Sequence, residues 1–156
     1  MKTFLIALGI FFIIVIIGFT LRFVSKSGTA ETTSDSLRRF NVGSASYAVE
    51  IATSTMDQAR GLSYRQTLPQ NQGMLFIFNQ PEDRKFWMLG MKFPLDFIWI
   101  REGLVVAISE NIPPPKGVSM PQVIDPLEAT DMVLEVNAGE IAKQGIKVGQ
   151  KTNLEE

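Results

Sequence analysis

The stretch GMLFIFNQPEDRKFWMLGMKFPLDFIWI, residues 73–100, decides the fold of this protein. It holds both tryptophans, five of the eleven phenylalanines and three of the seven methionines of the chain. Residues 73–78 form an apolar run that is too short for an ordinary helix and is rich in strand formers. Residues 86–89 and 95–100 predict two further strands, and Pro94 suits the start of a strand, where no ladder N–H is needed. We therefore expect the rest of the domain to cover or extend these three strands.

The sequence around this stretch predicts more short strands, separated by glycine and proline turns. Further strands are expected over residues 39–42, 47–51, 104–108, 131–136 and 146–151. Ser54 and Asp57 predict the start of a short helix over residues 55–62, and Gly145 is expected to end a second helix over residues 140–144. This pattern is typical of a mainly β, compact antiparallel sandwich or barrel with one or two short helices.

The N-terminal segment predicts one transmembrane helix. Residues 3–21 contain no charged residue and lie between Lys2 and Arg22. About 20 apolar residues match the hydrocarbon thickness of a bilayer, whereas a cleavable signal would have a shorter apolar core. We expect an anchor over residues 1–23, a polar flexible linker over residues 24–37 and a β domain over residues 38–156. The positive charges flanking the span are nearly balanced, and an anchor with its N-terminus inside is preferred, so the domain is expected outside the cytoplasm.

Composition excludes several classes of chemistry. The chain has 156 residues and a formal net charge of −1, and it contains neither cysteine nor histidine. Disulfides, thiolate catalysis, Cys/His zinc sites and triads with an imidazole base are therefore excluded. We expect no metal and no cofactor. The basic residues are scattered and form no recognisable motif, so nucleic acid is not an expected partner. The expected partners are the membrane, through the N-terminal helix, and a saccharide or protein of the cell envelope.

An ordered series of short motifs carries a family resemblance. Its members are Ala59-Arg60-Gly61-Leu62 with Arg65 and Leu68, Gly73-Met74-Leu75-Phe76 with Phe78, Phe86-Trp87-Met88, Pro94-Leu95-Asp96, Val133-Leu134-Glu135-Val136 with Ala138-Gly139, and Gly145 with Gly149. Over about residues 40–151 the series resembles domain-of-unknown-function family 192 (DUF192), which is found in bacteria and archaea. The resemblance implies a compact, mostly β domain, often behind a signal or an anchor, and no assigned activity. Two positions depart from the family pattern: Leu89-Gly90 replaces Lys-Asn, and Gly149-Gln150 replaces Gly-Asp.

Three carboxylates in or beside apolar strands are the candidate acid–base groups: Asp96, Glu110 and Glu135. Burial would raise the pKa of such a carboxyl, and a nearby guanidinium would lower it. Buried charges are normally paired, which favours a structural interpretation in which Asp96 and Glu135 neutralise Arg60 or Arg65. Alternatively, two converging carboxylates would permit glycosidic chemistry.

Arginine and tryptophan side chains supply the candidate binding groups. Arg60 and Arg65 could clamp a carboxylate, a phosphate or an acidic sugar, although a simple ion pair is favoured. Most aromatic residues of the central stretch are expected in the core, with Trp87 or Trp99 as the exposed remainder. The proline-rich segment over residues 113–129 is expected to fold back over one end of the domain, where it covers a strand edge or roofs a cleft.

Two hypotheses of function follow. The favoured one is a membrane-anchored binding or interaction module at the cell envelope, because the sequence offers no nucleophile, metal cluster or phosphate loop. The candidate site residues are Arg60, Arg65, Trp87, Asp96, Glu110, Asn111 and Glu135. The alternative is a hydrolase or lyase of envelope polysaccharide that works through Asp96 with Glu110 or Glu135. An enzyme of this kind needs two carboxylates in one solvent-open pocket, whereas a binding module does not.

Overall fold

The structure is a computed structural model that describes residues 37–117 and 122–155. The expected anchor and nearly all of the expected linker, residues 1–36, lie outside this part of the chain. Among the described residues, no helix has the length and the apolar character that crossing a membrane requires.

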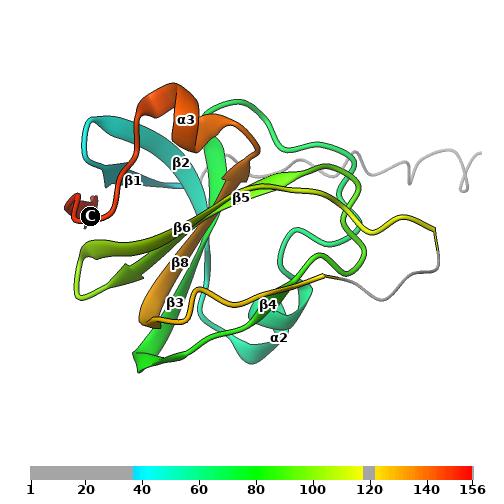
Figure 1. Cartoon of the computed structure of the whole chain (residues 1–156), viewed down its shortest axis with the longest axis horizontal. Coiled ribbons are helices and arrows are strands. Elements are labelled where there is room, and N and C mark those ends of the chain that lie inside the picture. The colour runs from blue at the N-terminus through cyan, green and yellow to red at the C-terminus, as the bar shows by residue number, and fades with distance from the viewer. Residues whose placement is uncertain (1–36, 118–121, 156) are drawn as a thin grey trace, which may run out of the picture. The chain divides into compact units, whose positions relative to one another are not determined.

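Seven strands form one sheet in the order β6-β5-β8-β3-β2-β1-β9. Figure 1 shows how the labelled strands lie in the domain. Their bounds are β1 Arg38–Val42, β2 Ala45–Ala52, β3 Gln72–Asp83, β5 Leu95–Arg101, β6 Leu104–Ile112, β8 Ala129–Asn137 and β9 Thr152–Leu154. A separate two-stranded sheet pairs β4 (Phe86–Trp87) with β7 (Val123–Ile124). Two of the three expected central strands, β3 and β5, therefore flank β8, whereas the third contributes only the short strand β4 of the small sheet.

The large sheet curls into a half-barrel, and the curl brings the start of β6 next to the chain around the start of β9. The segment that leads into β9 bonds to the start of β6: Thr152 donates its N–H to the carbonyl of Gly103 (2.8 Å), and Val105 donates to Gln150 (2.9 Å). These bonds satisfy backbone groups that an open edge would expose. The expected mainly β class with two short helices is confirmed, and the barrel-like alternative describes the curled sheet better than a sandwich does.

One strand pair departs from the expected antiparallel arrangement. Strands β2 and β3 are parallel, with Ile51 opposite Leu75. Parallel neighbours need a long crossover connection. Here residues 53–71 provide it, and they include helix α2 (Thr55–Arg60). This crossover places α2 beside the sheet and so builds one wall of the pocket described below.

Strand alternation gives the central strands two buried faces. Leu75, Ile98 and Leu134 face the interior of the half-barrel, where they pack with residues of β1, β2 and helix α3 (Glu140–Gln144). Phe76, Phe97 and their neighbours on the other face form a second core beneath α2 and β4. Phe86 of β4 packs its ring edge-on against Phe76, Phe97 and Trp99, with centroids 4.9, 6.0 and 5.4 Å apart. The expectation that most aromatic residues are core is confirmed.

Local signals at the helix ends are confirmed. The Ser54 hydroxyl accepts the N–H of Asp57 (3.1 Å) at the start of α2, and Gly145 adopts φ 64° at the end of α3. The final expected strand, over residues 146–151, is wrong, because the observed strand β9 begins only at Thr152, after the expected strand has ended. Gly149 and Gln150 instead bond to β6, which leaves only Thr152–Leu154 for pairing with β1.

Strand β3 is longer than expected. It continues past residues 73–78 and includes Pro81. The register with β8 shifts between Ile77 and Glu82, so the proline lies in an irregularity where the ladder needs no N–H from it.

Candidate functional site

A pocket of about 280 Å³ opens over the second face of the sheet. Its walls come from α2 and the residues after it, from β3, from the connection between β3 and β4, from β4 and from β8. The lining residues are Gln58, Ala59, Arg60, Gly61, Leu62, Ser63, Phe76, Phe78, Asp83, Arg84, Lys85, Phe86, Trp87, Met91 and Glu135. Three candidate site residues, Arg60, Trp87 and Glu135, meet here.

Glu135 is the buried acid of this pocket. It lies on β8 with Met74 of β3 and Phe97 of β5 as its cross-strand neighbours, so apolar groups flank its side chain. The residue is only 5% exposed, and its Oε2 atom has no hydrogen-bond partner among the described residues. Burial raises the pKa of Glu135 to about 8, against a smaller lowering effect of Arg65. Glu135 is therefore largely protonated at pH 7 in the free domain.

Four aromatic residues form the apolar part of the lining: Phe76, Phe78, Phe86 and Trp87. Trp87 is half-exposed, whereas Phe76 is buried. Gly61, which follows α2, has φ 49°, and a Cβ atom there would lie 3.3 Å from the ring of Phe76. This position therefore favours glycine, both for its backbone conformation and for its close approach to the pocket wall.

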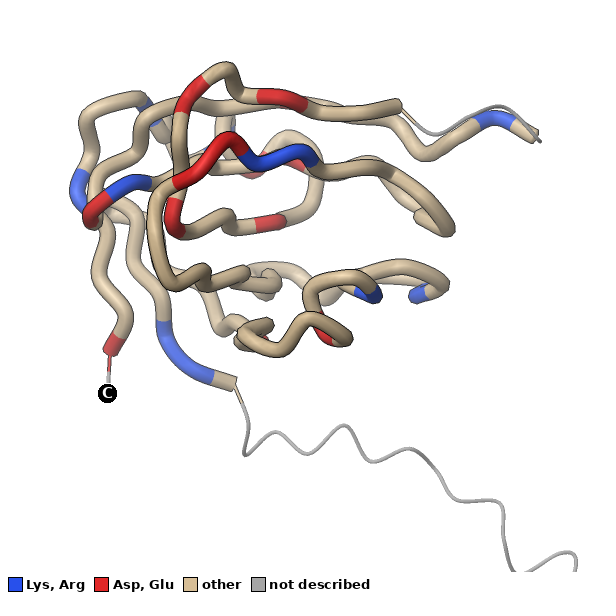
Figure 2. Tube along the Cα trace, turned by 90° about the horizontal axis from the view of Figure 1, so that it is seen from below, with Lys and Arg blue, Asp and Glu red and all other residues tan. Residues whose placement is uncertain are grey.

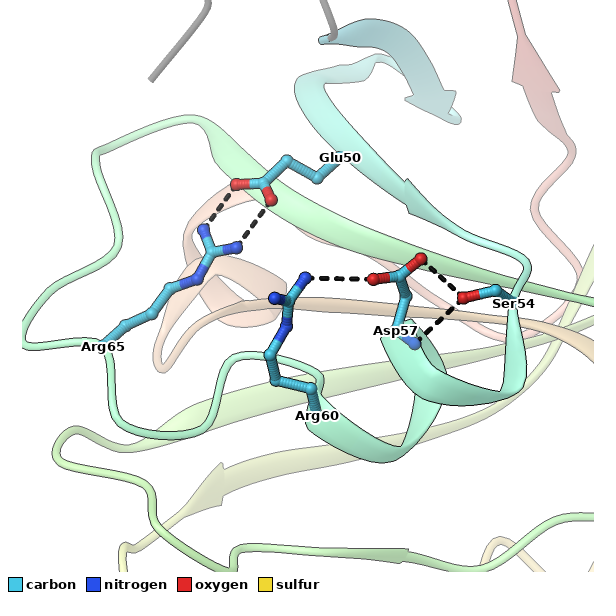
Figure 3. A network of polar contacts seen from close by, with 5 residues as sticks. All are labelled: Glu50, Ser54, Asp57, Arg60 and Arg65. Atoms are coloured by element: carbon cyan, nitrogen blue, oxygen red, sulfur yellow. Dashed lines mark hydrogen bonds and ion pairs between the residues drawn. The ribbon is translucent and has the colours of Figure 1, made fainter. Parts of the chain in front are cut away.

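Arg60 and Arg65 are engaged in ion pairs, as Figure 3 shows. Arg65 binds both carboxylate oxygens of Glu50 on β2, and this hydrogen bonding lowers the pKa of Glu50. Arg60 pairs with Asp57, one turn earlier in α2, at 3.0 Å. The ion-pair interpretation of these arginines therefore holds, but the partners differ from those expected.

The other cations of the pocket lining are also paired. The Arg84 guanidinium lies 3.1 Å from Glu82 and stacks on the ring of Phe78, 4.1 Å from its centroid. Lys85 lies 3.3 Å from Asp125. In this part of the chain two acidic residues, Glu82 and Asp83, are followed by two basic residues, Arg84 and Lys85. Figure 2 shows acidic and basic stretches side by side along the trace and no basic stripe.

Asp96 is fully buried and does not pair with an arginine, so that prediction is wrong. Its Oδ1 accepts the backbone N–H of Asn111 (2.7 Å), and its Oδ2 accepts the N–H of Ile141 (2.9 Å). The reason is the register: Asp96 lies opposite Val136, on the inner face of the half-barrel, whereas α2 covers the outer face. Asp96 thereby joins the end of β6 to the first turn of α3, and its role is structural.

The remaining candidates lie away from the pocket. Glu110 is exposed near the end of β6 and does not line this pocket. Asn111, with φ 54°, supplies the N–H that Asp96 accepts. Trp99 is buried, and its Nε1 donates to the Ser109 hydroxyl (3.0 Å). Among the described residues there is no cluster of three His, Cys, Asp or Glu side chains suited to a metal.

The segment over residues 113–129 reaches the pocket indirectly. Its strand β7 pairs Ile124 with Phe86 and Val123 with Trp87, and Ile124 packs into the second core. The segment therefore supports one wall of the pocket. Residues 118–121 lie outside the described part of the chain.

Sequence reasoning missed Asp83, Arg84 and Phe86 as lining residues. The sequence signal at Asp83 and Arg84 was that of an ordinary turn, since two acidic and two basic residues, 82–85, follow a proline. Their position beside Glu135 depends on strand pairing between β3 and β8, which the sequence of neither segment reveals.

The comparison with known families decides which family the chain represents. The profile of DUF192, described as uncharacterised ACR, matches residues 38–154. The chain belongs to the DUF192 family. Among curated proteins, none matches it.

Two solved structures resemble this DUF192 domain. A candidate transcription regulator from Sinorhizobium meliloti 1021 is 29% identical, with a TM-score of 0.69, over 76% of this chain and 93% of its own. A protein of unknown function from Novosphingobium aromaticivorans is 31% identical, with a TM-score of 0.68, over 75% of this chain and 84% of its own.

The DUF192 motifs converge on the pocket. Residues 59–62, Phe76, Phe78, Phe86, Trp87 and Glu135 belong to four motifs that are distant in sequence, and all of them line it. The Asp96 motif instead lies on the opposite face and stabilises the fold. In this chain, the motifs that carry the resemblance therefore divide between a structural carboxylate and a set of residues around one cavity.

Proposed function

We propose that this domain is a ligand-binding module that acts at the cell envelope from a membrane anchor, and that its ligand occupies the pocket over Glu135. The observation that carries the proposal is the buried Oε2 atom of Glu135, which lines the pocket without a hydrogen-bond partner. A buried polar group without a partner costs stability, typically about 1–3 kcal/mol. Such a group in an open pocket is a common sign of a binding or catalytic site.

The positions of the carboxylates favour a binding module over the polysaccharide hydrolase. Asp96 faces the other side of the sheet and is occupied by two backbone N–H groups. Glu110 does not line the pocket. The second carboxylate of the lining is Asp83, an exposed residue at the rim. A hydrolase with two converging acids would therefore depend on Asp83 with Glu135, and not on the pairs expected from the sequence.

Envelope saccharides are the first ligand class to test. The expected span over residues 3–21 would hold the domain at a membrane surface. Trp87 and the phenylalanines of the lining offer flat apolar faces, and Glu135 offers one directional polar group. Ligand sites commonly combine apolar walls with a few polar groups of this kind.

Ligand-observed NMR on the full-length chain in a non-ionic detergent would test the proposal against a panel of envelope saccharide fragments. Ala59→Trp places a large side chain in the pocket wall and is expected to abolish binding. Met56→Trp alters the same helix at a position that is 80% exposed and outside the lining, so it is the matched control.

The panel separates the two functions. Reversible binding that Ala59→Trp removes and Met56→Trp retains supports the binding module. Release of new reducing ends from polysaccharide by the parent, with loss in Glu135→Gln, supports the hydrolase or lyase. A panel without any binder, or binding that both tryptophan variants retain, overturns the assignment of function to this pocket.

A further inference from the structure

We propose that the pocket binds the ammonium group of a hydroxylated cationic ligand, with Glu135 as its counter-ion. This inference rests on the proposed function and specifies the ligand of the same site. The chemistry is that of an amino alcohol or an amino sugar, whose ammonium group would enter between the aromatic walls and whose hydroxyl oxygen would face Arg84.

The charges of the lining favour a cation. Five ionisable residues line the pocket: Arg60, Asp83, Arg84, Lys85 and Glu135. The three cations each have a carboxylate partner outside the lining, namely Asp57, Glu82 and Asp125. Asp83 and Glu135 form no ion pair with any described residue. The unpaired charge of the pocket is therefore negative once Glu135 is ionised.

Arg65 does not remove this need for a cation. The positive charge of Arg65 lowers the pKa of Glu135, but its guanidinium is held by both oxygens of Glu50. No side chain of the described chain donates to Glu135 Oε2. A carboxylate buried among Met74, Phe97 and Phe76 would be stabilised strongly by a ligand that brings its own positive charge.

The aromatic lining is suited to the same ligand. The faces of phenylalanine and tryptophan rings attract ammonium and guanidinium groups, by about 0.5–2 kcal/mol each depending on exposure. One such contact already exists within the pocket lining, because the Arg84 guanidinium lies 4.1 Å from the centre of the Phe78 ring. The half-exposed Trp87 and the partly exposed Phe86 remain for the ligand.

Arg84 accounts for the hydroxyl group of the proposed ligand. Its Nε atom is buried without a hydrogen-bond partner among the described residues, and Arg84 and Glu135 line the same pocket. An N–H of this kind requires an acceptor oxygen. A ligand with an ammonium group and a neighbouring hydroxyl satisfies both groups, whereas a simple tetraalkylammonium satisfies only Glu135.

Binding of a fixed cation couples to loss of the Glu135 proton. Glu135 is protonated in the free domain below its raised pKa of about 8, and the bound ammonium requires the carboxylate. The charged groups around it are Arg65 after α2, Arg60 on α2, and Asp83, Arg84 and Lys85 before β4. As Glu135 loses its proton, affinity for the cation should rise by about tenfold per pH unit below pH 8 and level off above it.

Calorimetry on the full-length chain in a non-ionic detergent tests this with choline, whose charge does not depend on pH. Its neutral counterpart 3,3-dimethylbutan-1-ol has the same shape and hydroxyl. We expect choline to bind at pH 8 at least tenfold more tightly than the alcohol, with release of close to one proton at pH 6.5. Glu135→Gln should abolish choline binding, and Glu110→Gln, an exposed carboxylate outside the lining, should retain it.

The outcomes distinguish this inference from the proposed function. Equal binding of choline and the alcohol, or choline affinity that does not change between pH 6 and pH 8, overturns the ammonium assignment. Binding of a neutral saccharide in the pocket, with no binding of choline, overturns the ammonium assignment as well. It leaves the proposed binding function intact. If neither choline nor any other compound binds, both proposals fail.

Two further probes identify the source of the ammonium group. Glucosamine binding without binding of N-acetylglucosamine would indicate an amino sugar, because acetylation converts the charged ammonium group to a neutral amide. Glycerophosphoethanolamine binding would indicate a lipid headgroup. Failure of both, with choline bound, would restrict the ligand to quaternary ammonium compounds.

Discussion

Asp96 and Glu135 lie on the paired strands β5 and β8, yet their side chains face opposite sides of the sheet. Asp96 is opposite Val136, and Glu135 is opposite Phe97, so the two carboxylates alternate across the strand pair. Asp96 receives two backbone N–H groups inside the half-barrel. Glu135 receives none at Oε2 and lines a pocket. One carboxylate therefore stabilises the fold on one face of the sheet, and the other, as we propose, binds a ligand on the opposite face.

Replacing Asp96 with alanine should destabilise the domain strongly. Asp96 is fully buried, and the change removes the carboxylate that accepts the N–H groups of Asn111 and Ile141. Hydrogen bonds to charged groups contribute about 1.5–3 kcal/mol each, so we expect a loss of about 3 kcal/mol or more. Urea unfolding followed by tryptophan fluorescence would measure it. Asp96→Asn keeps one acceptor and should lose less, and an alanine variant with the stability of the parent would refute the structural role.

Glu135→Gln should change how stability depends on pH. In the parent, the folded pKa of Glu135 is about 8, above the usual carboxyl value, so the folded state binds more protons than the unfolded state between these values. The parent therefore loses stability as pH rises from about 5 to 8, by about 1.4 kcal/mol per pH unit. The glutamine variant lacks this contribution, so its free energy of unfolding should rise relative to that of the parent as the pH increases over that range. Unfolding curves at pH 5, 6.5 and 8 would show it, and parallel pH profiles would contradict it.

Arg65→Gln should raise the pKa of Glu135 further. The positive charge of Arg65 lowers this pKa in the parent, so its removal leaves the effect of burial unopposed. Carbon-13 NMR titration of the Glu135 carboxyl would detect the shift. Arg60→Gln is the matched control, since Arg60 is exposed and paired with Asp57, and it should leave the Glu135 titration nearly unchanged. A downward shift in the Arg65 variant would show that Arg65 acts on Glu135 through structure instead of charge.

The β domain should fold without residues 1–33. A fragment that begins at Ser34 keeps every described strand and should be soluble and unfold cooperatively on heating. Aggregation of this fragment, together with normal melting of the full chain in detergent, would place the boundary elsewhere.

The topology of the full chain can be tested independently. The uncharged residues 3–21 and the preference for an inside N-terminus predict that a C-terminal reporter enzyme active only in the periplasm will be active. Activity of a cytoplasmic reporter at the same position would reverse the orientation.

The sequence by itself determined the elements that depend on neighbours a few residues away. Strand alternation predicted β1 and β2, Ser54 and Asp57 predicted the start of α2, and Gly145 predicted the end of α3. The ordered motifs predicted the DUF192 family. These features follow from backbone propensity and helix capping, which depend on residues only a few positions apart in the sequence.

Only the tertiary structure decided the roles of the charged residues. The sequence could not tell that Glu50, and not Asp96, is the partner of Arg65, because 15 positions separate the pair and a parallel strand crossover brings them together. Nor could it place Asp96 and Glu135 on opposite faces, since that depends on the register between β5 and β8. Register is fixed by long-range burial, and shifting a strand by one residue would exchange its two faces.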